Sequence, residues 1–218
     1  MEWLICVYLR GDDMKPDEVE KLMNFKFPKR WMEVYQTGAM AWLELSREKF
    51  RADRDRYIND PKAFLMISSD CEPLPFDHYE EWKNLLDESL AMSAKYEDLH
   101  LQDDITLIPF GISGGGDFFC FWFEKGKEND TDEPKYIFFA HDDPYSQELI
   151  GESFDEFMYY CLLSAVSIDE CIENEKTWNC QLEYIKGKYR NKLLEMTEDE
   201  MLDEFDSLLF KKPDIWKK

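Results

Sequence analysis

The stretch from Ile105 to Phe157 constrains the fold most, because apolar runs alternate there with turn residues. It begins ITLIPF, passes through three glycines at 114–116 into the aromatic run FFCFWF, and returns after an acidic loop as YIFFA. Apolar runs separated by glycine-rich and acidic turns are typical of strands in an antiparallel meander. The run at 118–123 is aromatic on both faces, which predicts a central strand. Asp142-Asp143-Pro144 then predicts a turn out of the sheet.

Helix signals lie on both sides of this stretch. Pro16 occupies a favoured first-turn position, and Gly38 marks the end of the helical pattern that follows Phe27-Pro28. Ser153-x-x-Glu156 and Thr197-x-x-Glu200 are capping boxes, each of which predicts a helix start. The expected fold class is therefore α+β: a mixed, mostly antiparallel sheet flanked by helices, with an extra helical C-terminal tail.

Other segments carry weaker patterns. Trp3–Leu9 is a continuous apolar run that predicts a buried strand, and Ala63–Ile67 predicts a short one. Cys71–Phe76 holds two prolines and is expected to be a loop. Asp77 is expected to cap a helix that reaches Ser93, with an apolar side formed by Trp82, Leu85, Leu86 and Leu90.

The length of 218 residues suits one domain. We expect residues 1–218 to form it, with a core at about 14–167 and a helical extension at 168–218 packed on that core. No apolar run approaches the roughly 20 residues that span a bilayer, and the N-terminal segment does not match a signal peptide. Six cysteines occur without a C-x-x-C pair. We therefore expect reduced thiols and a cytoplasmic location.

The net charge of −22 is concentrated in the middle of the chain. Residues 1–60 hold 11 basic and 12 acidic residues, residues 63–175 hold 5 and 27, and residues 176–218 hold 9 of each. Such a field repels nucleic acid and acidic membranes and attracts a basic protein. We therefore expect a protein partner, with no nucleic acid and no membrane. The alternative is that the acids serve only solubility.

The sequence contains no pattern that supports catalysis. Gly114–Asp117 matches no phosphate-binding motif and precedes a strand, so a tight turn explains it better. Ser113 lacks the G-x-S-x-G context, and Cys120 lies in an aromatic run. His141 and Asp142, with Asp117, are suitable metal donors, but no second histidine stands at ligand spacing. We expect no catalytic residue, no cofactor and no metal, and hence no enzyme.

The order of these motifs resembles the SUKH superfamily, the Smi/Knr type of immunity and regulatory domains. The matching motifs are Phe27-Pro28 with Trp31, Ile108–Gly111, Gly116-Asp117, His141-Asp142 and Ser153–Phe157. The resemblance implies structural roles for Pro28, Trp31, Gly111, Gly116, Asp117, Ser153, Phe154 and Phe157. The chain departs from the compact pattern in its first apolar run, in the long segment between Gly38 and Ile105, and in its C-terminal tail.

The resemblance also implies a non-enzymatic role. Bacterial members are typically immunity proteins that bind and neutralise a toxin, often a nuclease, whereas eukaryotic relatives are linked to regulation of cell-wall synthesis. The leading hypothesis is an immunity protein that binds a basic toxin domain. The candidate contacts are the acids Glu128, Asp130, Asp132, Glu133, Asp142, Asp143, Glu148 and Glu152. The alternatives are a regulatory scaffold and a carboxylate-rich metal hydrolase around Asp117, His141 and Asp142.

Overall fold

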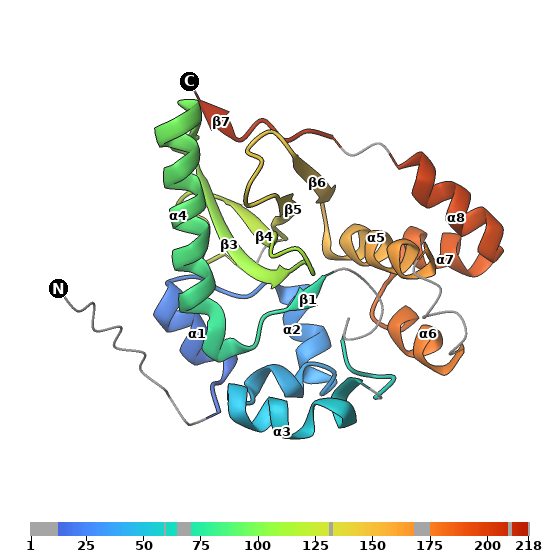
Figure 1. Ribbon diagram of the computed structural model, residues 1–218. Helices are drawn as coiled ribbons and strands as arrows, with labels where there is room; N and C mark the ends of the chain where they lie inside the picture. The colour runs from blue at the N-terminus through green and yellow to red at the C-terminus, as the bar shows by residue number, and fades with distance from the viewer. Residues whose placement is uncertain are drawn as a thin grey trace.

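A five-stranded antiparallel sheet forms the centre of the protein (Figure 1). The computed structural model describes residues 13–58, 60–64, 71–130, 133–167, 175–208 and 211–217. The strand order is β1-β3-β4-β5-β6, and every described pair is antiparallel. The strands are β1 (Glu72–Pro73), β3 (Ile105–Ile112), β4 (Phe118–Glu124), β5 (Lys135–Phe139) and β6 (Gln147–Gly151). The central place of β4 and the α+β class are as the sequence predicts.

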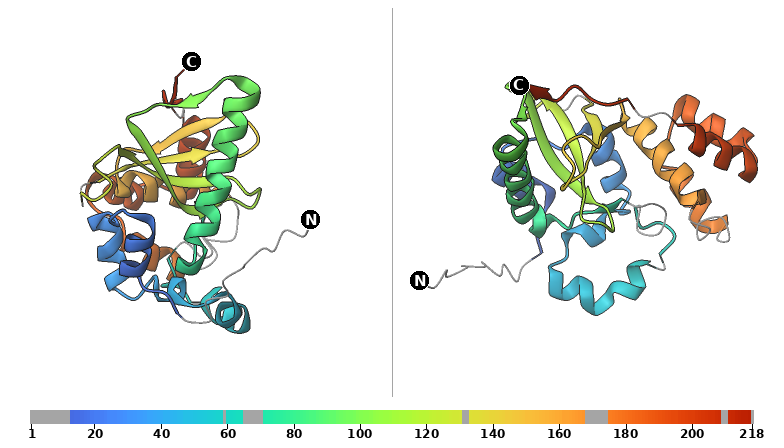
Figure 2. Two further views of the ribbon diagram at one scale, coloured as in Figure 1. Left: turned by 90° about the vertical axis from the view of Figure 1, so that its left-hand side faces the viewer. Right: turned by 45° about the horizontal axis from the view of Figure 1, so that its top comes forward.

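Helices cover both faces of this sheet. Figure 2 shows α4 on one face, and α5 with α7 and α8 on the other side. The described helices are α1 (Pro16–Met23), α2 (Lys29–Gln36), α3 (Arg47–Ile58), α4 (Tyr79–Glu97), α5 (Phe154–Ser167), α6 (Glu175–Leu182), α7 (Gly187–Glu195) and α8 (Glu198–Ser207), with 3-10 turns η1 (Ala41–Glu44) and η2 (Phe76–His78). No helix in the described parts of the chain is both long and apolar enough to cross a membrane.

The larger core lies between the sheet and α2 and α5. Trp31 of α2 is fully buried, with ring centroids 5.2 Å from Phe110 and 5.4 Å from Phe121. Phe157 of α5 stacks on Tyr136 at 4.9 Å. Strand side chains alternate between faces, so every second residue of β3, β4 and β5 reaches this aromatic core. Aromatic pairs at these separations add to the burial energy, which explains why the central strands are so rich in phenylalanine.

A smaller core fills the opposite face. It contains Leu86 of α4 and alternate residues of the inner strands, among them Phe118 and Phe139. Ile215, from the end of the chain, is fully buried in it. The aromatic run of β4 thus serves two cores, because the sheet is covered on both sides.

The last described segment crosses this second face, and we call residues 211–217 the C-terminal strap. Its strand β7 (Trp216–Lys217) pairs with β2 (His100–Leu101) in a two-stranded antiparallel sheet. Near its start, the amide of Leu149 in β6 donates to the carbonyl of Lys211 at 3.0 Å. Figure 1 shows the strap passing across the top of the sheet toward the end of α4.

Several local expectations are wrong in detail. Cys71–Phe76 contains strand β1 as well as loop, since Pro73 pairs with Gly111 at the sheet edge, where its missing N–H costs nothing. Ala63 and Phe64 lie in a turn rather than a strand, and the rest of that expected strand lies outside the described residues, as does Trp3–Leu9. Strand β6 follows the Asp142-Asp143-Pro144 turn, where no further strand was expected.

Helix boundaries differ in two places. Asp77 lies in η2, and α4 begins two residues later and continues to Glu97. Leu85, expected on the buried side of α4, is 39% exposed. The helix starts after Ser153 and Thr197 agree with the capping boxes: the amides of Glu156 and Glu200 donate to the two cap hydroxyls.

Candidate functional site

A groove of about 520 Å³ runs along α4, and we call it the α4 groove. One wall is the outer face of α4 from Trp82 to Glu97. The other wall consists of the β3–β4 turn at Gly116, the start of β4, and the β5–β6 turn at 141–144. The two turns that the sequence predicts at GGGD and HDDP therefore meet the helix at one place.

Exposed apolar side chains concentrate on this groove. Leu85, Met92 and Tyr96 recur at helical spacing along α4 and are 39%, 52% and 62% exposed. Tyr145 is 54% exposed, and its hydroxyl donates to Glu97 Oε2 at 3.3 Å, which joins the β5–β6 turn to α4. Large apolar side chains gathered in one exposed place are typical of interaction sites, whereas scattered ones are not.

Acidic side chains surround this apolar surface. Glu88 and Glu97 of α4 and Asp142 of the β5–β6 turn line the groove, and none of the described lining residues is Lys or Arg. Lys95 lies beside it with Nζ 3.0 Å from the hydroxyl of Tyr96, and Lys212 of the strap donates to the carbonyl of Tyr145 at 3.2 Å. The groove therefore presents an apolar floor with a negative rim, which favours a partner that is apolar and basic.

A hydrogen-bonded corner built on Asp117 fixes one end of the groove. Asp117 Oδ1 accepts the backbone N–H of His141 at 3.1 Å and lies 2.9 Å from His141 Nδ1. Asp117 Oδ2 accepts the hydroxyl of Ser113 at 2.9 Å. Gly116, with φ +90°, closes the turn in a conformation that suits glycine. These bonds hold the β3–β4 and β5–β6 turns together.

The electrostatics of the corner follow from these bonds. Partial burial raises the pKa of Asp117, but hydrogen bonds from His141 and Ser113 outweigh it, and the pKa lies below its ordinary value. The hydroxyl of Ser146 and the amide of Tyr145 donate to Asp143 and lower its pKa. Both carboxylates are therefore charged at neutral pH and serve as acceptors for their own turns.

The same corner contains the metal-donor set that the sequence suggests. Donor atoms of Asp117, His141 and Asp142 lie within 4.8 Å of one another. Histidine and carboxylate donors suit zinc and similar divalent ions. Both oxygens of Asp117, however, already accept hydrogen bonds that hold the turns. A metal would have to displace those bonds, so turn structure accounts for this cluster more simply.

The acids chosen from the sequence lie in several places. Asp142 lines the groove and Asp143 follows it in the same turn, whereas Glu148 and Glu152 lie on or beside β6. Glu128 and Asp130 lie in the β4–β5 loop, and neither lines the α4 groove. Of these candidate contacts in the described parts of the chain, only Asp142 lines the groove, and Asp143 is its neighbour in sequence. Asp132 lies outside the described residues.

Glu133 and Glu128 have structural partners. Glu133 Oε1 accepts the hydroxyl of Tyr136 at 2.7 Å and the amide of Phe154 at 2.8 Å, so it helps to hold the start of α5. Burial raises the pKa of Glu133 against these bonds. Glu128 accepts the hydroxyl of Thr106 at 2.5 Å and the amide of Gly126 at 2.8 Å. Both carboxylates therefore accept hydrogen bonds from within the chain.

The motif residues occupy structural positions. Pro28 precedes the first turn of α2, and Trp31, Phe154 and Phe157 are fully buried. A Cβ on Gly111 would lie 2.7 Å from Cys71 Sγ, so a larger residue would push β1 away from β3. Ser153 caps α5 as described above. These positions explain why the motif order carries information about the fold rather than about a reaction.

Reasoning from sequence missed Glu88, Glu97 and the apolar residues Met92 and Tyr96. A usable signal was present, because Leu85, Met92 and Tyr96 extend the apolar pattern of α4 beyond the single face that packs on the sheet. An apolar stripe wider than one buried face predicts a second contact. The pattern does not show which loops meet that stripe.

The fold and the groove define a small α+β domain with an apolar, acid-rimmed surface site. The model of the SMI1 / KNR4 family (SUKH-1) matches residues 12–160, and the chain belongs to this family. Its members are generally non-catalytic immunity or regulatory domains. No curated protein and no solved structure matches the chain. The match ends within α5, so α6, α7, α8 and the C-terminal strap lie beyond it.

Proposed function

We propose that this chain is a non-enzymatic protein-binding domain that acts as an immunity protein and neutralises a toxin by binding it. The observation that carries the proposal is the α4 groove, where exposed apolar side chains are surrounded by Glu88, Glu97 and Asp142. Membership of a family of immunity and regulatory domains supports it. Protein interfaces combine this kind of apolar centre with a charged rim.

The mechanism proposed is occlusion of the toxin's active site or of its substrate path. Toxins that act on nucleic acid carry basic substrate grooves, and a protein of net charge −22 complements such a surface. The acidic field accelerates encounter, and the apolar groove slows dissociation. The same field disfavours nucleic acid and acidic membranes as partners.

Co-expression tests this proposal. The chain is expressed with each toxin domain encoded beside its own gene, and growth is compared with that of cells that express the toxin alone. We expect protection against one of them, together with a complex that survives size-exclusion chromatography. Absence of protection against every neighbouring toxin, with no complex formed, would contradict the proposal.

A regulatory scaffold of the cell-wall-synthesis type is the second candidate, because the same family includes regulatory domains. The two roles differ in the partner. Affinity capture followed by reconstitution from purified components would return a housekeeping protein for the scaffold and a toxin for the immunity protein. A metal hydrolase around Asp117, His141 and Asp142 is the third candidate, and elemental analysis of the purified chain tests it.

We further propose that residues 1–218 form one domain, with its core at about 14–167 and an extension at 168–218. Packing supports this: α7 and α8 contact α5, and Leu193 and Met201 belong to the main core. We place the protein in the cytoplasm. The free thiols of Cys120 and Cys180 are in keeping with a reducing compartment, and burial raises the pKa of Cys120.

A further inference from the structure

We propose that the α4 groove seats one amphipathic, basic helix of the partner protein, with the partner's apolar side chains on Met92 and Leu85 and its Lys or Arg side chains on the acidic rim. The inference rests on the proposed protein-binding function and specifies the chemistry of the partner.

The shape of the groove fits a helix. The wall from Trp82 to Glu97 measures about 22 Å along the axis of α4, at ~1.5 Å per residue, which is roughly four helical turns. Its exposed large apolar residues stand at 85, 92 and 96, so they form a stripe into which the side chains of a second helix can interdigitate. Met92 is flexible and polarisable, which suits a floor that adapts to an incoming side chain.

An added strand fits poorly. Strand addition requires an unpaired sheet edge, whose backbone groups bond the incoming chain. The strands whose ends reach the groove, β4 and β5, are both inner strands of the sheet with neighbours on each side. Side chains therefore form the recognition surface here, as they do when a helix lies in a groove.

The rim selects the charge of the partner. Glu88 and Glu97 are nine positions apart on α4, about 13 Å along the axis, and Asp142 faces them from the opposite wall. Basic residues placed on both sides of an apolar stripe would reach these carboxylates. A second copy of this chain is a poor occupant, because it carries the same charge of −22 and would bring like charges together.

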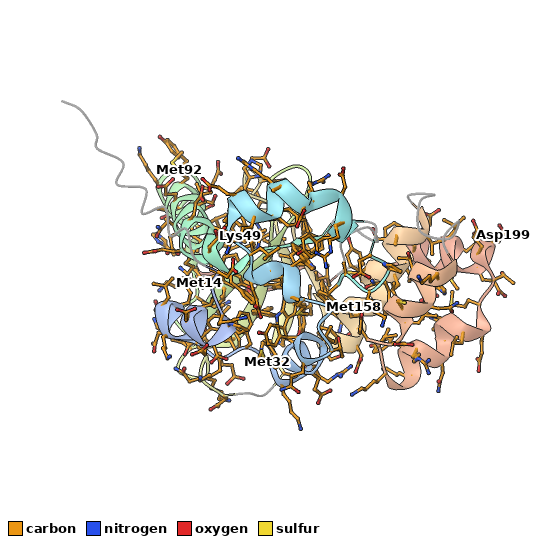
Figure 3. The ribbon with its side chains drawn as sticks, turned by 90° about the horizontal axis from the view of Figure 1, so that it is seen from below. Met14, Met32, Lys49, Met92, Met158 and Asp199 are labelled. Atoms are coloured by element: carbon orange, nitrogen blue, oxygen red, sulfur yellow. The ribbon has the colours of Figure 1, made fainter. Side chains whose placement is uncertain are left out.

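Figure 3 shows Met92 at the outer end of α4, far from Asp199 on α8, so the groove and the C-terminal helices can be varied independently. Leu194 and Glu195 of α7 supply matched controls. Leu194 is 56% exposed and apolar, like Met92, and Glu195 is an exposed acid, like Glu88. Met92→Lys is therefore compared with Leu194→Lys, and Glu88→Gln with Glu195→Gln.

The probe is a synthetic peptide of about 16 residues, ~24 Å long as a helix, with leucines on one face and arginines flanking them. A charge-reversed twin carries glutamates in place of the arginines, and an apolar-deleted twin carries serines in place of the leucines. Binding to the full chain is measured by fluorescence anisotropy at low and high salt. Circular dichroism and thermal unfolding show that each variant is folded.

We expect the basic amphipathic peptide to bind and neither twin to bind. Met92→Lys should weaken binding by about tenfold or more, as loss of a central contact does. Glu88→Gln should weaken it by roughly three- to tenfold at low salt and by less at high salt, because salt screens rim charges. Both α7 controls should bind within about twofold of the unmodified chain.

Equal binding of the charge-reversed twin, or equal losses in the α4 and α7 variants, would overturn the inference. The experiments distinguish failure of the groove as the docking site from failure of the immunity function. A toxin neutralised equally well by the Met92→Lys variant would refute the groove as the docking site and leave the immunity function in place. Specific peptide binding without protection against any toxin would support the groove and count against the immunity function.

Discussion

The indole N–H of Trp216 donates to the backbone carbonyl of Pro144 at 2.8 Å. This bond joins the C-terminal strap, which lies beyond the family match, to the β5–β6 turn that forms one wall of the α4 groove. The ring of Trp216 also packs on Phe139 of β5, with centroids 5.9 Å apart. The strap therefore holds the groove wall in place, although it does not line the groove.

Trp216→Phe tests this bracing role. The substitution keeps an aromatic ring beside Phe139 and removes the N–H donor, so the carbonyl of Pro144 loses a hydrogen bond. We expect a loss of about 0.5–1.5 kcal/mol in the free energy of unfolding. We also expect amide hydrogen exchange in residues 142–147 to be faster in the variant than in the unmodified chain, whereas exchange in β3 should change little. Unchanged exchange in that turn would show that the strap does not hold it.

Asp117→Asn tests the corner that joins the two turns. The folded pKa of Asp117 lies below its ordinary value, so its charged form stabilises the fold at pH above that value, and this stabilisation is lost as pH falls through the folded pKa. We expect the variant to be less stable by about 1–2 kcal/mol near neutral pH. The difference in the free energy of unfolding between the variant and the unmodified chain should become smaller below about pH 4. A difference in the free energy of unfolding that is independent of pH would mean that the charge of Asp117 does not contribute to stability.

Glu33→Gln tests the ion-pair cluster that joins α2 to the C-terminal helices. Lys186 and Arg30 bind Glu33 and lower its pKa to about 2, and Arg30 also bonds Asp155 of α5 at 2.9 Å. The stabilisation from Glu33 is therefore present above about pH 4.5 and lost as pH falls toward 2. Because Glu33 is partly exposed, we expect a loss of only ~0.5–1 kcal/mol at neutral pH, measured by urea unfolding. Glu195→Gln is the control, and an equal loss there would contradict this role for the cluster.

Metal removal tests the hydrolase alternative. Because the carboxylate of Asp117 is engaged by His141 and Ser113, we expect chelation to leave the thermal midpoint of the purified chain unchanged. Added zinc should likewise not raise that midpoint. Elemental analysis of protein purified without chelator supplies the second measurement. A stoichiometric metal that His141→Ala removes would contradict our interpretation of the corner and favour the hydrolase.

Local chemistry made much of the sheet and several helices predictable. Pro16, Ser153 and Thr197 start helices for reasons that lie within a few residues, and the aromatic run at 118–123 could only be a strand covered on both faces. Strand β6 was not predictable in this way, because QELIG is short and mixes polar with apolar residues. This segment becomes a strand because it pairs with β5, which is itself part of the sheet.

The candidate site was harder to predict than the fold. The sequence indicates that acids matter, but it does not show which of them meet an apolar surface. Glu88 and Met92 line a groove only because the folded chain places the β3–β4 and β5–β6 turns beside α4. Glu133, an acid in a polar loop, turns inward to Tyr136 and Phe154, and no feature of its neighbours in sequence indicates this. Contacts between segments that are far apart in the sequence determine both the groove and the inward direction of Glu133.

The most direct test of the account is neutralisation of a neighbouring toxin by groove variants in cells. The unmodified chain, Met92→Lys, and the matched control Leu194→Lys are each co-expressed with the toxin, and survival is counted alongside the amount of soluble chain. We expect protection by the unmodified chain and by Leu194→Lys, and loss of protection with Met92→Lys at equal protein level. Full protection by Met92→Lys, or no protection by the unmodified chain against any neighbouring toxin, would contradict it.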